Sequence, residues 1–272
     1  MTDWEKLLTD ATERVWKVAD SVGRGPDRSR TVGSGAAGDD TLVADRDAER
    51  VLVESLSSVR ELRMLSEEAG DLGPRSSRYL AVIDPLDGSS NFSRGIPFYC
   101  TSVCVVEGPG LGDARYALVR NLVNGDVYYA ERGRGAKKNH TRIHSSAATE
   151  LSDSIAAIDV SKASQETVRE LSPLVSRLKR QVHFGANALE ICMVAEGRVD
   201  AFIDIRGRMR VTDIAGAFLI AREAGAVVSS ETGEELDPPL DLTSRVNCVA
   251  AANGTLHARL IAELPVFRRR RP

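Results

Sequence analysis

The sequence of 272 residues predicts an α+β fold, and three observations lead to this prediction. Over the first ~145 residues, two helical patterns precede short apolar runs that read as a mostly antiparallel sheet. From residue 155 onward, strand and helix patterns alternate, as they do in α/β structures. The pattern changes near Ala147, where no flexible linker is evident. We therefore expect an N-terminal α+β subdomain over residues 1–147 and a C-terminal α/β subdomain over residues 148–272.

The first helices are predicted from apolar residues at helical spacing. Trp4 and Val15 belong to a series that predicts an amphipathic helix over residues 3–22. Residues 23–40 are rich in Gly, Ser, Asp and Arg, and we expect a mobile loop there. Loops of this length are either disordered or functional. A second apolar series predicts a helix at about residues 45–58.

Short apolar runs predict the strands of the first sheet. They cover residues 62–66, 79–83, 99–107 and 114–123. The dipeptide Asn124-Gly125 is typical of a tight hairpin and leads into a further strand at residues 126–132. The first two runs end directly in carboxylates, Glu67-Glu68 and Asp84 respectively, so a glutamate can converge on Asp84.

The second half contains eight further elements. Strands are predicted at residues 155–160, 199–205, 226–230 and 246–251, and helices at residues 165–178, 187–196, 212–224 and 256–264.

The composition excludes several classes of protein. Hydrophobic residues make up 42% and charged residues 28% of the chain, which excludes disordered, collagen-like and coiled-coil chains. The net charge of −3 provides no basic footprint for nucleic acid, and we interpret the terminal run Arg268–Arg271 as a solvated end. We find no secretory leader and no apolar run of about 18 residues, so we expect no membrane partner and a cytoplasmic location. The four cysteines form no C-x-x-C pair and are expected to be buried thiols.

The densest chemical signal is Asp84-Pro85-Leu86-Asp87-Gly88-Ser89-Ser90-Asn91-Phe92. Two carboxylates three positions apart follow an apolar strand, Pro85 holds a turn, and Gly88 allows close backbone approach. The Ser-Ser-Asn residues are typical helix caps, and free N–H groups at a helix start suit a phosphate. Because carboxylates repel anions, the combination favours a phosphate bridged by metal. The alternative is a capped turn with two solvated acids. An EF-hand is excluded because its ligands need a spacing of two.

Further acidic residues extend this set. Asp213 opens a predicted helix, and Asp39, Asp40 and Asp45 lie in or just after the Gly-rich loop. For Asp213 and Asp45, a helix-capping role is the alternative. None of the four histidines lies in these clusters, and all-oxygen sites select magnesium, manganese or calcium over zinc. Two such ions are a standard route to phosphoester hydrolysis. The sequence contains neither a P-loop nor a G-x-S-x-G element, which argues against a P-loop kinase and a serine hydrolase.

Taken together, these motifs resemble those of the inositol monophosphatase family. Residues 84–92 resemble its D-P-[IL]-D-G-[ST]-x-N-F signature, Ser66-Glu67-Glu68 its G-E-E element, and Thr212–Gly216 its W-D-x-A-[AG] element. The segments 185–190 and 194–201 resemble the intervening substrate-side region. The motifs follow the family's order over about residues 40–250.

Two further segments, Gly38–Thr41 and Asp204–Arg208, resemble the archaeal-type members more closely. Those members combine inositol monophosphatase with fructose-1,6-bisphosphatase activity. The sequence departs from the family at Thr212, which replaces a Trp, and at Val182, where archaeal-type members tend to carry Arg.

The resemblance implies a layered α-β-α-β-α sandwich, a homodimer, and a requirement for Mg²⁺, with Mn²⁺ as a second possible ion. The implied metal ligands are Glu67, Asp84, the Leu86 carbonyl, Asp87 and Asp213. The implied catalytic residues are Glu67 and Ser89, which would orient the attacking water, and Asp39, Thr41 and Asp45, which would belong to a mobile catalytic loop. The implied substrate-binding residues are Asp87, Gly88, Ser89, Gly185, Asn187, Asp204 and Arg206. The N-terminal subdomain would thus hold the metal site, and the C-terminal one the substrate-side residues.

We therefore expect a magnesium-dependent phosphomonoesterase whose partner is a small phosphorylated molecule, either fructose-1,6-bisphosphate, inositol-1-phosphate or both. Arg206 would clamp a second phosphate, the alternative being a solvated basic turn formed with Arg208 and Arg210. A nucleotide 3′-phosphatase or NADP phosphatase of the same fold is an alternative function. A catalytically silent sugar-phosphate-binding protein is an alternative of another class.

Overall fold

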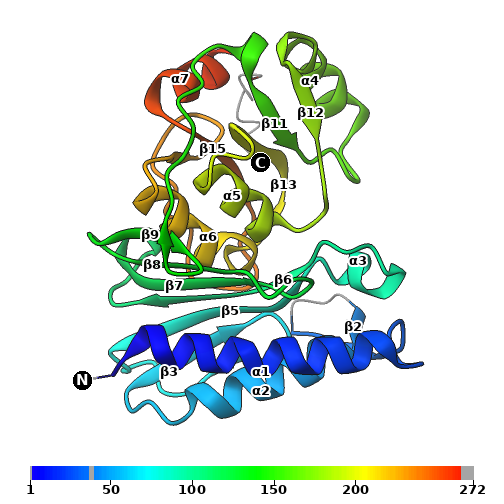
Figure 1. Cartoon of the computed structure of the whole chain (residues 1–272), viewed down its shortest axis with the longest axis vertical. Coiled ribbons are helices and arrows are strands. Elements are labelled where there is room, and N and C mark those ends of the chain that lie inside the picture. The colour runs from blue at the N-terminus through cyan, green and yellow to red at the C-terminus, as the bar shows by residue number, and fades with distance from the viewer. Residues whose placement is uncertain (1, 37–39, 265–272) are drawn as a thin grey trace.

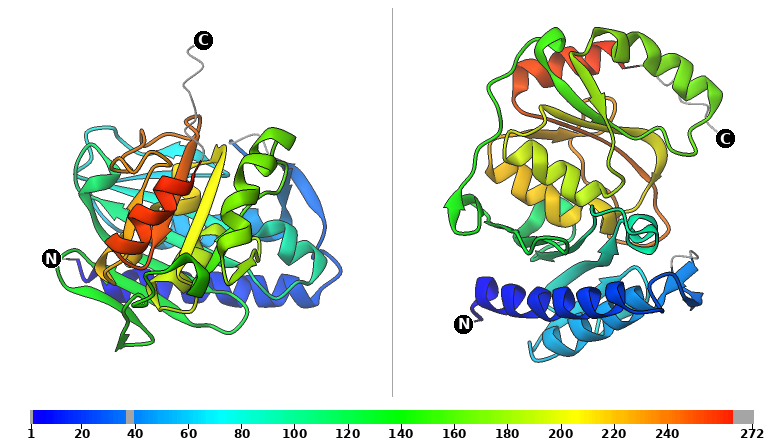
Figure 2. Two further views of the ribbon diagram at one scale, coloured as in Figure 1. Left: turned by 90° about the horizontal axis from the view of Figure 1, so that it is seen from above. Right: turned by 45° about the vertical axis from the view of Figure 1, so that its right-hand side comes forward.

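The computed structural model describes residues 2–36 and 40–264. The helices in this part of the chain are α1 (Trp4–Arg24), α2 (Val43–Leu56), α3 (Ser89–Arg94), α4 (Gln165–Arg177), α5 (Asn187–Ala195), α6 (Val211–Glu223) and α7 (Gly254–Glu263). They stack with two sheets into five layers (Figure 1). The helices α1 and α2 lie on one side of the first sheet, α5 and α6 lie between the sheets, and α4 and α7 cover the outer face of the second sheet (Figures 1 and 2). The predicted α+β class and the layered sandwich are confirmed.

The first sheet has eight strands in the order β10-β9-β8-β7-β6-β5-β3-β4. Their bounds are β3 (Leu62–Ser66), β4 (Gly70–Leu72), β5 (Tyr79–Asp87), β6 (Cys100–Val106), β7 (Ala114–Asn121), β8 (Val127–Glu131), β9 (Gly135–Lys138) and β10 (Thr141–Arg142). All neighbouring strands are antiparallel except β3 and β5. The parallel pair matters for function, because it brings the carboxyl ends of β3 and β5 to the same edge of the sheet.

The second sheet has five strands in the order β12-β11-β13-β15-β14. Their bounds are β11 (Ile155–Ile158), β12 (Arg180–Val182), β13 (Ala201–Met209), β14 (Val227–Ser229) and β15 (Val246–Ala251). The strands β12, β11 and β13 are parallel, whereas β13, β15 and β14 are antiparallel.

The central strands and helices are buried along almost their whole length because both of their sides are covered. Every residue of β6 is buried, as is every residue of β5 after Tyr79. Strands covered on both faces lose the apolar–polar alternation of a half-exposed sheet. Helix α6 follows the same rule: ten of its residues are buried, since it packs between the two sheets. By contrast, α1 has one polar face, and Trp4, Leu8 and Val15 point toward the first sheet.

Most predicted elements are confirmed, but the short ones were missed. Part of the predicted loop over residues 23–40 forms a two-stranded hairpin of β1 (Thr31–Ser34) and β2 (Asp40–Leu42). The strands β4, β9, β10 and β12 were also missed. Each has only two to four residues and carries no readable periodicity. The division at residue 147 stays a prediction.

The cysteine prediction is confirmed, since all four are buried and free. Among the described residues, no helix is long and apolar enough to cross a membrane. The terminal arginine run lies outside the described residues.

Candidate active site

Three carboxylates from distant parts of the chain meet at one edge of the first sheet. Glu67 directly follows β3, and Asp84 lies near the end of β5; the parallel register pairs Ser66 with Ile83 and so places these two acids together. Asp213 comes from the first turn of α6. One ligand oxygen of each acid lies within 4.8 Å of the other two. The convergence of a glutamate on Asp84, expected from the sequence, is confirmed for Glu67.

The electrostatics of this cluster favour a bound cation. Burial and then the charge of Asp213 raise the pKa of Glu67 to about 8, although the Arg210 guanidinium lowers it. Burial also raises the pKa of Asp84 well above its ordinary value, and the neighbouring acids add to this effect. Burial likewise raises the pKa of Asp213. Crowded acids with raised pKa values repel one another when ionised, and a divalent cation removes that repulsion. An all-oxygen set of carboxylates suits a hard cation such as Mg²⁺.

Asp213 also caps its own helix. Its Oδ2 accepts the backbone N–H of Arg210 at 2.9 Å, the bond typical of a residue in the first turn. Asp213 therefore both caps α6 and belongs to the carboxylate cluster. Asp84 is likewise held by a short local bond, since its Oδ1 accepts the Leu86 N–H at 3.0 Å.

Asp87 connects the two halves of the chain. Its oxygens accept the N–H groups of Asn187 at 3.2 Å and Ala188 at 2.7 Å, which are the first two residues of α5. Burial raises the pKa of Asp87 to about 7, although the hydrogen bonds from these two N–H groups lower it. Between Asp84 and Asp87 the pairing of β5 with β6 is irregular, and the buried Leu86 lies in this bulge. Since Asp84 and Asp87 are both buried, the interpretation as two solvated acids is wrong.

The turn after Asp87 requires glycine. Gly88 is the N-cap of α3 with φ = 87°, and a Cβ there would lie 3.0 Å from the Phe98 carbonyl oxygen. Ser89 is the first residue of α3, so the cap lies at Gly88 and not at the Ser-Ser-Asn residues named from the sequence. Asn91 instead donates to the carbonyls of Phe98 at 2.8 Å and Phe184 at 2.7 Å.

The predicted catalytic loop lies beside the carboxylates. Thr41, on β2, donates its hydroxyl hydrogen bond to Glu68. Asp45 lies in the first turn of α2, where its Oδ2 accepts the Leu42 N–H at 2.7 Å; Leu42 is the N-cap, so Asp45 caps the helix from inside it. Burial raises the pKa of Asp45 to about 7, and Glu68 and Glu49 contribute to the rise. Asp39 lies outside the described residues.

A cleft of about 1050 Å³ opens next to the turn at Gly88. Gly185, Asn187 and Arg206 line it, as the sequence predicts for the substrate side, whereas Asp204 is fully buried behind the cleft wall. Five cationic residues also lie in the lining, namely Lys162, Arg206, Arg208, Arg210 and Arg245. Asp159 is the one acid among the lining residues that the structure describes. Such a positive cleft attracts an anionic ligand.

The predicted clamp, Arg206, is already bound to the protein. Its guanidinium contacts Asp204 through two bonds of 2.9 and 2.5 Å and donates to the Ser161 carbonyl at 2.7 Å. It also pairs with Asp159. Arg206 thus forms the floor of the cleft rather than a solvated turn. Its role as a phosphate clamp stays a prediction. To bind a phosphate, Arg206 would have to give up some of these hydrogen bonds.

Two cleft residues, His183 and Arg210, had no functional role assigned to them from the sequence. His183 lies between the fully buried Glu190, at 3.1 Å, and Asp159, at 3.4 Å, and the hydrogen bond to Glu190 raises its pKa. It directly follows Val182 at the end of β12. Arg210 was named only as part of a basic turn, whereas in the structure its Nη1 lies 2.5 Å from Glu67 Oε1. Arginines occur at positions 206, 208 and 210, and residues two apart on a strand lie on the same face. This spacing was the pattern from which a shared arginine face could have been predicted.

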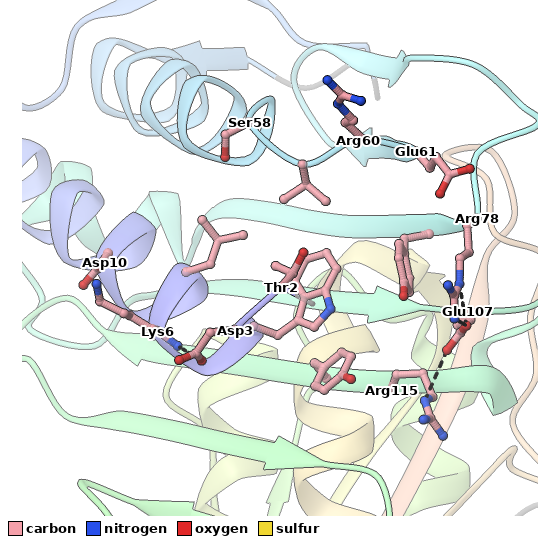
Figure 3. Close-up of a pocket in the computed structure, with 15 residues that line it drawn as sticks. Thr2, Asp3, Lys6, Asp10, Ser58, Arg60, Glu61, Arg78, Glu107 and Arg115 are labelled. Atoms are coloured by element: carbon pink, nitrogen blue, oxygen red, sulfur yellow. Dashed lines mark hydrogen bonds and ion pairs between the residues drawn. The ribbon is translucent and has the colours of Figure 1, made fainter.

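A second cavity of about 1010 Å³ lies at the opposite end of β5 (Figure 3). Its floor is aromatic, with the ring of Trp4 centred 5.3 Å from that of Tyr79. On its rim, Glu107 forms ion pairs with both Arg78 and Arg115. The first cleft is the better candidate for catalysis, because its lining residues Arg210 and Asn187 are hydrogen-bonded to the acids Glu67 and Asp87.

Comparison with known proteins identifies the fold and the chemistry. The sequence model of the inositol monophosphatase family matches residues 3–266. The chain belongs to the inositol monophosphatase family. It is therefore a phosphomonoesterase, and the silent binding protein is no longer supported.

Two members of this family show how close the similarity is. The chain is 34% identical to a fructose-1,6-bisphosphatase/inositol-1-monophosphatase of Methanothermobacter thermautotrophicus, over 97% of each chain. A solved inositol monophosphatase–fructose 1,6-bisphosphatase superimposes with a TM-score of 0.85 at 31% identity, covering 97% of this chain and all of the other.

A third relative has a different activity in its name. The chain is also 34% identical to a bifunctional NADP phosphatase/NAD kinase of Methanococcus maripaludis, over 84% of this chain and 43% of the relative. Family membership therefore leaves the choice among phosphorylated substrates open.

Proposed function

We propose that this inositol monophosphatase family member is a Mg²⁺-dependent phosphatase of fructose-1,6-bisphosphate and inositol-1-phosphate. The observation that carries the proposal is the cluster of Glu67, Asp84 and Asp213, which Arg210 connects to a cleft lined by cationic residues. Relatives named for both of these activities, similar over nearly the full length, add support.

One set of residues would bind the metal, and another would bind the phosphate. Glu67, Asp84, Asp87, Asp213 and the Leu86 carbonyl would hold divalent cations. Bound cations would supply positive charge to the phosphoryl oxygens and to the attacking water.

The turn after Asp87 would receive the phosphate. The backbone N–H groups at the start of α3, with the Ser89 hydroxyl, would bind the phosphoryl oxygens and stabilise charge as it develops. Glu67 and Ser89 would orient the attacking water. Thr41 and Asp45 would complete the site from the side of β2 and α2. Asp39 is included in the proposal as a further catalytic residue.

The cleft wall would bind the rest of the substrate. Asn187 would contact sugar hydroxyl groups from the start of α5, and Gly185 leaves the space beside it open. Among the residues that the structure describes, the exposed Arg208 has no ion pair or hydrogen bond, so it is available to a second phosphate. This arrangement would accept a bisphosphate, whereas Arg206 and the buried Asp204 would hold the shape of the floor.

Activity is expected only with a divalent cation. Phosphate release from both substrates should fall by at least about 100-fold in excess chelator and return with Mg²⁺ or Mn²⁺, since metal charge at a phosphoryl group is worth several kcal/mol. A colorimetric phosphate assay measures this. Full hydrolysis in chelator, or stimulation by Zn²⁺ without any response to Mg²⁺, would contradict the metal mechanism.

A second candidate function is removal of phosphate from a nucleotide such as NADP. One wall of the cleft is apolar, with Phe184 38% and Ile96 46% exposed. The centroids of the Phe184 and Phe98 rings lie 5.0 Å apart with an angle of 31° between the ring planes, and a base could stack on the exposed Phe184 ring. The NADP phosphatase relative points the same way.

A substrate panel separates the two candidates. We expect faster phosphate release from fructose-1,6-bisphosphate and inositol-1-phosphate than from NADP or adenosine 3′,5′-bisphosphate. Under the nucleotide candidate, Phe184→Ala should lower kcat/KM for NADP by about 5- to 150-fold, since stacking is worth ~1–3 kcal/mol per base, and should leave fructose-1,6-bisphosphate nearly unaffected. Ile96→Ala is the matched control on the same wall. A preference for NADP that depends on Phe184 would overturn the sugar phosphate assignment.

A further inference from the structure

Arg210 joins the carboxylate cluster to the substrate cleft. It is the N-cap of α6, and its backbone N–H donates to Asp213 Oδ2 at 2.9 Å. Its guanidinium Nη1 lies 2.5 Å from Glu67 Oε1, and its side chain is 12% exposed. The same side chain forms part of the cleft lining. One residue therefore contacts two of the three clustered acids and also borders the space for substrate.

The charge of Arg210 acts on the oxygens that a divalent cation would use. A guanidinium stays protonated at every relevant pH. Its positive charge lowers the pKa values of Glu67 and Asp213, against the raising effect of burial. Arg210 therefore favours the ionised acids in the way that a metal ion would. Two cations that share Glu67 repel each other, and this repulsion is strong where solvent is scarce.

We propose that Arg210 and the divalent cation compete for Glu67, so that metal binding releases the Arg210 guanidinium to the anionic group of the substrate. The proposal rests on the proposed function, because it takes the carboxylate cluster as the metal site. It makes Arg210 a positioning residue that couples the two binding events. Without metal, the guanidinium neutralises Glu67; with metal, it adds positive charge to the cleft.

Direct titration of the metal tests the competition without any turnover. Mn²⁺ binding is measured by calorimetry, at fixed pH and without substrate, for the wild type, Arg210→Gln and Arg210→Lys. The glutamine variant should bind Mn²⁺ about tenfold more tightly, as a charged hydrogen bond of ~1.5 kcal/mol no longer has to be broken. The lysine variant should lie between the two. Arg208→Gln, which removes a cleft arginine from the same strand end, should leave the Mn²⁺ affinity unchanged.

The second readout follows the released guanidinium. With saturating Mn²⁺, inorganic phosphate should bind about tenfold more weakly to Arg210→Gln than to the wild type. In a crystal structure of the wild type with Mn²⁺, Arg210 should no longer be hydrogen-bonded to Glu67. This structure tests the proposal even if the glutamine variant does not fold.

Unchanged or weaker Mn²⁺ binding by a folded Arg210→Gln would overturn the competition, since Arg210 would then support Glu67 as a ligand. An intact Arg210–Glu67 bond beside bound Mn²⁺ would do the same. A wild type that binds no Mn²⁺ and releases no phosphate would instead contradict the proposed function itself, so the two failures can be told apart.

Discussion

Replacing Asp84 with asparagine is expected to lower kcat/KM by about three orders of magnitude while leaving the metal-free protein at least as stable as the wild type. The substitution removes a charge from the metal site but keeps an oxygen that can accept the Leu86 N–H. Because burial and the neighbouring acids raise the pKa of Asp84, its ionised form is unfavourable in the absence of a cation. Phosphate release and thermal unfolding in chelator measure the two effects.

Two comparison variants make this result specific. Asp87→Asn should also abolish turnover, but it should lower stability as well, because an amide NH₂ would face one of the two N–H groups of α5. Asp20→Asn, on the exposed face of α1, should change neither quantity. A large fall in the melting temperature of Asp84→Asn would indicate that this acid is structural. More than a tenth of wild-type activity would show that it is no metal ligand.

In chelator, the stability of the protein should fall as the pH rises from about 5 to about 8, and Mg²⁺ should oppose this fall. The pKa values of Asp45 and Asp87 are about 7 and that of Glu67 is about 8 in the folded state, against about 4 in an unfolded chain. An acid whose pKa rises on folding favours the folded state while it is protonated. That contribution is complete below the unfolded pKa and is lost as the pH passes the folded pKa.

The size of this effect follows from the pKa values. A pKa that moves from about 4 to about 7 corresponds to roughly 4 kcal/mol, and the acids repel one another, so their contributions do not simply add. We expect a fall in melting temperature of the order of 5–10 °C. With saturating Mg²⁺ the slope should nearly vanish, because the cation binds the ionised acids and binds better at higher pH.

Differential scanning calorimetry at several pH values, with chelator or with Mg²⁺, measures both curves. Asp84→Asn should flatten the curve in chelator, whereas Asp20→Asn should not. Stability that rises from pH 5 to pH 8 in chelator would contradict the assignment of a crowded acidic site.

The long elements could be predicted from the sequence because their signals are local. Helix α1 has a clear apolar face, and β5 is an apolar run that ends in acids. The hairpin β1–β2 could not be predicted, since its strands are short and sit in a polar, Gly-rich stretch. Likewise, Gly88 takes the N-cap position because the Phe98 backbone lies close to it. No local sequence pattern predicts this contact.

The candidate site follows the same rule. Each acid could be named because a motif surrounds it, but its partners could not. The contact between Arg210 and Glu67 spans 143 positions, and the bond from Asn187 to Asp87 spans 100. Arg206 could be assigned to the substrate side from the sequence, but its contacts with Asp159 and with the Ser161 carbonyl could not be predicted. Such contacts depend on how the layers pack.

The hydrogen bonds between Asp87 on β5 and the start of α5 determine when activity appears during folding and when it is lost during unfolding. Asp87 reaches its two amide partners only when the middle layer has docked on the first sheet, and Asp213 joins Glu67 and Asp84 only through the same docking. Contacts this remote in sequence form late, because their loop-closure entropy must be overcome first. The protein is therefore catalytically competent only after the middle layer has packed against the first sheet. On heating, inactivation should come before the loss of helical circular dichroism, since a small separation of the layers already disperses the acids.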